Sequence, residues 1–105
     1  MSADVKCAPG ANEKAPALPN RPVALTRAGG FPDQQGTVKL KAADGAVPMD
    51  PKKWTPAAIT ATVPGQAPGK PPFKVEIQVG NQTFTGTIDV RSVPGDGSGY
   101  PPART

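Results

Sequence analysis

The segment from Phe73 to Val90 constrains the fold more than any other part of this 105-residue chain, because its apolar side chains recur at every second position. Alternation with a period of two predicts a β-strand that buries one face. Gly80-Asn81 interrupts the pattern with a two-residue turn that supplies positive φ at low cost. The segment therefore predicts a β-hairpin, with Phe73, Val75, Ile77, Val79, Phe84, Gly86, Ile88 and Val90 on its apolar face.

Shorter stretches with the same alternation lie upstream and predict strands at residues 23–27, 37–41, 47–49 and 58–63. The loop Pro64–Pro72 is too rich in proline and glycine for a helix, and no amphipathic helix of useful length occurs elsewhere. Turns recur about every ten residues, which is typical of a β-sandwich. We expect a meander of five to seven short antiparallel strands with one apolar face.

The two ends of the chain have a different composition from the middle. Residues 1–22 hold four of the 15 prolines and show no period, and residues 93–105 return to glycine and proline. Proline fixes φ and favours extended backbone. We therefore predict three parts: an extended N-terminal arm (1–22), a β-sandwich (23–92) and a flexible C-terminal tail (93–105). The arm is either a disordered terminus or a segment that becomes ordered against a neighbouring subunit.

The inventory of reactive side chains argues against catalysis. The chain has no histidine, which removes the usual general base and the commonest zinc ligand. Its acidic residues are scattered singly, and Cys7 has no acid or base organised beside it. The net charge of +4 is not gathered into a stripe of the kind that nucleic acid requires. We expect a protein that is not an enzyme, has no cofactor or metal and does not bind nucleic acid.

Short motifs recur along the middle of the chain, at Gly30-Phe31, Gly36-Thr37-Val38, Trp54-Thr55, Ile59 to Pro64, Gly69 and Phe73 to Val90. In this series a glycine-aromatic turn precedes a short strand, a tryptophan leads into a strand that ends in Val-Pro, and a glycine turn opens the final hairpin. Together these motifs resemble the IPT/TIG family of immunoglobulin-like domains. The opening strand of the family is only partly matched by Arg21 to Arg27, so the first strands are expected to be shortened or differently paired.

This resemblance covers roughly residues 22–91 and implies an all-β, small immunoglobulin-like antiparallel β-sandwich used for recognition or as a spacer. It implies no catalytic residue. A core of about 70 residues is marginal alone, so part of the stability is expected to come from a partner or from self-association. The residues expected to contact that partner are Leu18, Pro19, Arg21, Trp54, Thr85 and Tyr100.

Residues 1–20 lack the apolar run of a signal peptide, and no stretch approaches the ~20 apolar residues of a membrane span. Synthesis in a host cytoplasm followed by release in a virion reconciles this with an immunoglobulin-like module. The sequence hypothesis is thus a capsid decoration protein whose arms bind the lattice of capsid subunits. A second copy of the chain, in a homo-oligomer, is the other partner that we consider. The alternative is a carbohydrate- or surface-binding module that uses Trp54, Tyr100 and the Pro64–Pro72 loop.

Overall fold

The computed structural model describes residues 4–11, 14–93, 95 and 97–102, and these form β-strands, turns and loops. The strands are β1 (Lys6–Ala8), β2 (Pro22–Thr26), β3 (Thr37–Lys41), β4 (Ala46–Trp54), β5 (Ile59–Thr62), β6 (Phe73–Val79) and β7 (Gln82–Ile88). All pair antiparallel in one sheet, in the order β1-β2-β5-β4-β3-β6-β7. The prediction of an all-β chain with up to seven antiparallel strands is confirmed.

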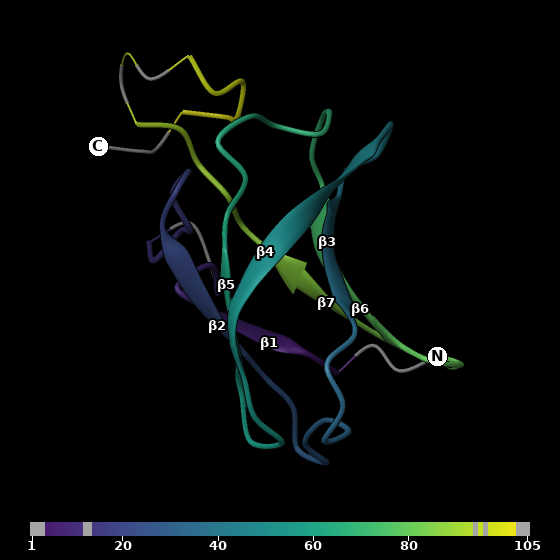
Figure 1. Cartoon of the computed structure of the whole chain (residues 1–105). Helices are drawn as coiled ribbons and strands as arrows, with labels where there is room; N and C mark the ends of the chain where they lie inside the picture. Colours follow the sequence, from purple (N-terminus) through teal and green to yellow (C-terminus); the bar gives the residue numbers. More distant parts are fainter. Residues whose placement is uncertain (1–3, 12–13, 94, 96, 103–105) are drawn as a thin grey trace.

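The connectivity differs from the predicted meander, because β2 pairs with β5 and β3 pairs with β6. The nine-residue strand β4 joins the two halves of the sheet, and Figure 1 shows it running obliquely across the molecule. Its first part pairs with β3 through Met49, and its second part pairs with β5 from Asp50 onward, with a register shift between Pro51 and Lys53. Each part has one neighbour, and proline is tolerated in strands at such edges and bulges.

The sheet curls until its two edge strands approach each other, so the molecule is close to a closed barrel (Figure 1). The Val5 backbone N–H, just before β1, donates a hydrogen bond to the carbonyl oxygen of Thr85 in β7 (3.0 Å). Where two separate sheets were expected, one continuous sheet thus surrounds the core. The fully buried side chains at its centre include Leu25, Leu40, Ile59 and Ile77.

The β6–β7 hairpin agrees with its sequence pattern. Phe73 pairs with Ile88 and Val79 pairs with Gln82, which leaves Gly80 and Asn81 as the turn. Gly80 has φ of 57°, a conformation that costs glycine little. The apolar positions of both strands are buried, while their polar neighbours are exposed or half-buried.

The predicted N-terminal arm is part of the barrel. Residues 6–8 form β1 against β2, with Cys7 opposite Leu25, and Val5, Cys7 and Ala17 lie in the core. The boundary predicted at residue 22 therefore does not divide the core. Proline content suggested an independent arm, but proline forbids neither a short edge strand nor the bridges between such segments. Residues 6–8 pair with a strand more than fifteen residues away in the sequence, so their own sequence contains no local periodicity that would predict the pairing.

The C-terminal tail also returns to the barrel. Tyr100 is buried, and its ring packs edge-on against Phe73 with the ring centroids 5.5 Å apart. The Ala67 N–H donates to the carbonyl oxygen of Ser98 (2.8 Å), which ties the tail to the loop between β5 and β6. At the opposite end of the barrel, Phe31 and Phe84 form a second edge-on pair at 5.9 Å. An aromatic pair therefore lies near each end of the core.

Gly86 tests the closure between β1 and β7. A Cβ atom at this position would overlap the backbone carbonyl of Val5. We expect Gly86→Ala to lower the free energy of unfolding by about 1 to 3 kcal/mol, because the backbone of the first strand would have to move away. Chemical denaturation followed by tryptophan fluorescence measures this change. Thr87→Ala, at an exposed position on the same strand, is the control and is expected to change stability by less than about 0.5 kcal/mol. Equal midpoints for both variants would show that the seam is open.

Candidate functional site

The three contact residues predicted near the end of the N-terminal arm lie beside β5. Pro19 is buried, Leu18 is half-buried and Arg21 is exposed. The Val63 N–H donates to the carbonyl oxygen of Arg21 (2.9 Å), and the Asn20 N–H donates back to that of Val63 (2.9 Å). Their backbone thus continues the pairing of β2 with β5. Of the three, the Arg21 side chain is the most accessible to a partner.

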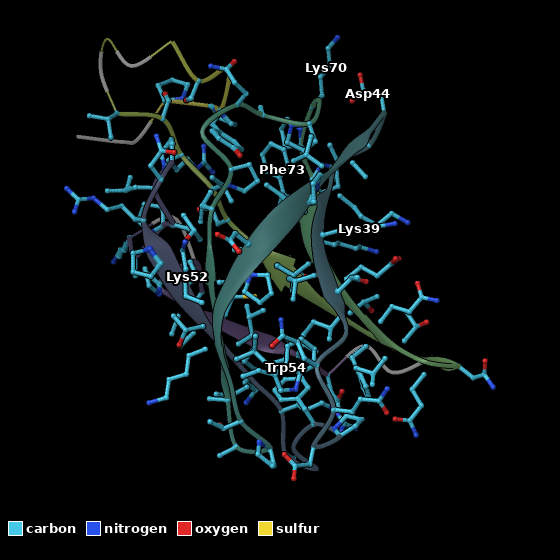
Figure 2. All side chains as sticks on the ribbon, in the orientation of Figure 1. Lys39, Asp44, Lys52, Trp54, Lys70 and Phe73 are labelled. Carbon is cyan, nitrogen blue, oxygen red and sulfur yellow. The ribbon has the colours of Figure 1, made fainter. Side chains whose placement is uncertain are left out.

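Trp54 and Tyr100 lie at opposite ends of the barrel. Figure 2 shows Trp54 at the end far from Phe73, the residue on which the Tyr100 ring packs. The Trp54 indole is half-buried against the core, and its Nε1–H donates to the carbonyl oxygen of Pro32 (3.2 Å). The Tyr100 hydroxyl donates to the carbonyl oxygen of Pro64 (2.8 Å). The structure therefore does not bring these two rings together as one sugar-stacking platform.

Cys7 is buried in β1, whereas the sequence suggested a thiol in a flexible arm. Burial among apolar side chains raises the pKa of the thiol from its ordinary value of 9.0 to about 12, because the thiolate loses its hydration. The thiol is consequently protonated and unreactive near neutral pH. Its role in the folded chain is that of a small apolar core side chain.

Thr85, the remaining predicted contact residue, belongs to an ordered polar surface on the outside of β3, β6 and β7. The strand registers place polar side chains in three rows across these strands, and we call this surface the polar face. Each of its members is exposed or half-buried. The rows are Thr37–Gln78–Thr83, Lys39–Glu76–Thr85 and Lys41–Lys74–Thr87.

The polar face carries three cations and one anion. Lys41 Nζ donates to Glu76 Oε2 at 3.1 Å and forms an ion pair. Among the described residues, neither Lys39 nor Lys74 forms an ion pair or a side-chain hydrogen bond. In Figure 2, Lys39 points outward from β3, away from the barrel interior. The face therefore has a local charge of +2, obtained as three lysines minus one glutamate.

A groove with a volume of about 370 Å³ opens in the polar face. It is lined by Lys41, Ala42, Ala43, Pro72, Lys74, Glu76 and Thr85. The loop between β5 and β6 holds one wall in place. The Ala43 N–H donates to the carbonyl oxygen of Lys70 (2.9 Å), and the Lys70 N–H donates to Asp44 Oδ1 (2.8 Å). In Figure 2, Asp44 and Lys70 are adjacent, at the end of the barrel where Phe73 lies.

The side chains of this groove are suited to binding. Two ammonium groups can attract an anion, a threonine hydroxyl can donate or accept, and the alanine and proline carbons offer apolar contact. In the described part of the chain, no three His, Cys, Asp or Glu residues are grouped to hold a metal ion. The same residues include no helix of the length and apolarity needed to cross a membrane.

The alternation at residues 37–41 and 73–90 leaves these lysines and threonines on the face opposite the apolar one, but only Thr85 was expected to contact a partner. Alternation gives the face of a strand, whereas the register of β3 against β6 decides that Lys41, Lys74 and Glu76 meet. That register joins residues more than thirty positions apart. No local signal in the sequence could have identified the groove.

Comparison of the chain with protein-family models, with curated proteins and with solved structures gives no match.

Tyr100 provides a test of whether the tail belongs to the core. We expect Tyr100→Phe to lower the free energy of unfolding by about 0.5 to 1.5 kcal/mol, because the hydrogen bond to Pro64 is lost. Tyr100→Ala should cost about 3 kcal/mol or more, since a buried ring is removed. Urea denaturation of the purified chain measures both. Val93→Ala, at an exposed tail position, is the control. A Tyr100→Ala midpoint equal to that of the control would show that the tail does not pack on the barrel.

Cys7 and Tyr100 make stability depend on alkaline pH. Burial also raises the pKa of Tyr100 from 10.0 to about 12. The unfolded chain loses each proton at the ordinary pKa of the group, while the folded chain retains it up to about pH 12. The contribution of these two groups to the free energy of unfolding is therefore fully present below pH 9. It is lost as the pH rises from about 9 to about 12. Urea midpoints measured at several pH values give the slope. Cys7→Ala should flatten it from about pH 9 upward, and Tyr100→Phe from about pH 10 upward. Unchanged slopes in both variants would contradict the burial of these groups.

Proposed function

We propose that the chain is an immunoglobulin-like binding module. In the constant-type immunoglobulin domain, strands A, B, E and D form one layer and strands C, F and G form the other. With the strands lettered in chain order, β1-β2-β5-β4 corresponds to the first layer and β3-β6-β7 to the second. This agreement in strand order supports the proposal, as does the resemblance of residues 22–91 to the IPT/TIG family. The pairing of β3 with β4 then closes one side of the two layers.

The function that the geometry supports best is attachment to a protein surface through the polar face. The observation that supports this function is the ordered array of polar side chains on β3, β6 and β7, with a groove among them. Three neighbouring strands within one continuous sheet hold these side chains at fixed spacing. Such rigidity reduces the ordering cost that a binding surface must overcome.

Within this class we propose a non-enzymatic virion structural protein, a capsid decoration protein that binds the lattice of the major capsid protein. The contact differs from the one expected from the sequence. Val5, Cys7 and Tyr100 fill the core of their own barrel, so these parts of the ends are occupied within the molecule. The polar face replaces them as the surface that meets the lattice, with Arg21 as an additional exposed contact on the opposite half of the sheet.

A gradient experiment tests the virion role. Particles released from cells that produce the chain are separated by density, and each fraction is probed for the chain and for the major capsid protein. We expect the chain to migrate with the capsids at a constant ratio to the capsid protein, and purified chain to bind particles that lack it. Recovery of the chain only in particle-free fractions would refute the proposal. Light scattering of the purified chain establishes whether it associates with itself before binding.

A further inference from the structure

The groove in the polar face holds two like charges at short range. Lys41 and Lys74 are directly opposite each other in the antiparallel pair of β3 and β6. Opposed Cα atoms in such a pair are separated by about 4.5 to 5.5 Å, and like charges in this position destabilise a sheet. Lysine side chains are long enough to diverge, so the repulsion is reduced but not removed. An anion placed between the two ammonium groups would convert this repulsion into attraction.

Glu76 compensates the charge of only one of the two lysines, Lys41. Its carboxylate is bound to Lys41 at 3.1 Å and is largely covered, with 17% of the side chain exposed, whereas the Lys41 side chain is 48% exposed. Lys74 is exposed and has no acidic partner among the described residues. An incoming anion can therefore bind Lys74 and share Lys41 without breaking a buried ion pair.

The other wall of the groove determines what kind of anion fits. Ala42, Ala43 and Pro72 add carbon atoms to the lining that contains the two lysines, and Thr85 adds a hydroxyl. An acidic side chain on a peptide has apolar neighbours that can contact such a wall. A free phosphate has no apolar part to place there. A nucleic acid would require a longer track of cations than the two lysines of this groove provide.

We propose that the groove formed by Lys41, Lys74, Thr85 and the Ala42–Ala43–Pro72 wall binds an acidic segment of a partner protein. A carboxylate of that segment lies between the two ammonium groups, and its apolar neighbour lies against the wall. The inference rests on the proposed protein-binding function and specifies the chemistry of the partner at the same site.

An NMR titration of the isotope-labelled full chain tests this directly. The probe is a capped hexapeptide with two glutamates flanked by leucines, and the matched peptide has glutamine in place of each glutamate. We expect saturable shifts of the Lys41, Lys74 and Thr85 amides with the acidic peptide and not with the glutamine peptide. Raising salt from about 0.01 M to about 1 M should abolish them, because the screening length falls from roughly 30 Å to 3 Å.

Variants locate the site. Lys74→Gln and Lys41→Gln should each weaken peptide binding by about two- to fivefold, the range expected for one exposed ion pair. Lys52→Gln removes the same charge from β4, where Lys52 pairs with Asp50 at 2.7 Å, and should leave binding unchanged. All three positions are exposed, and matching amide spectra confirm folding. Equal weakening by Lys52→Gln, shifts spread over the whole surface, or the same shifts with inorganic phosphate at the same affinity would overturn the proposal.

The same variants separate this inference from the proposed function. Charge reversals Lys41→Glu and Lys74→Glu are added to the particle-binding experiment, with Lys52→Glu as the control. Particle binding that survives both groove reversals refutes the groove and leaves the virion role standing. Peptide binding at the groove by a chain that never associates with particles refutes the virion role and leaves the groove standing.

Discussion

The approach of the N-terminal segment to the last strand closes the sheet around the core. Residues 5–8 complete the sheet by pairing with β2 and meeting β7, and they place Val5 and Cys7 over the core. Gly86 makes this possible, because any side chain there would displace the Val5 carbonyl. A core of this size gains stability by covering its own edges, which would otherwise expose unpaired backbone groups.

The ends of the barrel are sealed by different chemistry. Near one end, the Arg27 guanidinium stacks on the Phe84 ring at 4.5 Å and its Nε donates to Asp4 Oδ1 at 3.0 Å. A cation above an aromatic ring and a partly exposed ion pair each contribute modestly, on the order of 1 kcal/mol or less. Near the other end, Tyr100 contributes a buried ring and a hydrogen bond to Pro64. Asp4 belongs to the predicted arm and Tyr100 to the predicted tail, so both termini contribute contacts to the folded domain.

Inclusion of the ends in the core changes which surface we propose for partner binding. Flexible arms would gain order and contacts only on docking, whereas the polar face is already ordered before any partner arrives. A preformed surface loses less entropy on association. Lys41 and Lys74 face each other across β3 and β6, and only Lys41 is paired with Glu76. The proposed function therefore rests on the order of three adjacent strands, and the proposed acidic partner rests on the register that places Lys41 opposite Lys74.

Alternation of side chains by itself determined the all-β class, the β6–β7 hairpin with its Gly80-Asn81 turn, and which residues face inward on β3. These are local properties, since the inward or outward direction of a side chain follows from its position along its own strand. Tertiary structure alone decided the burial of Cys7 and Tyr100, the order of the strands, and the meeting of Lys41 with Lys74. Each of these depends on pairing or packing between distant segments, and short segments rich in proline carry no periodic signal that predicts such pairing.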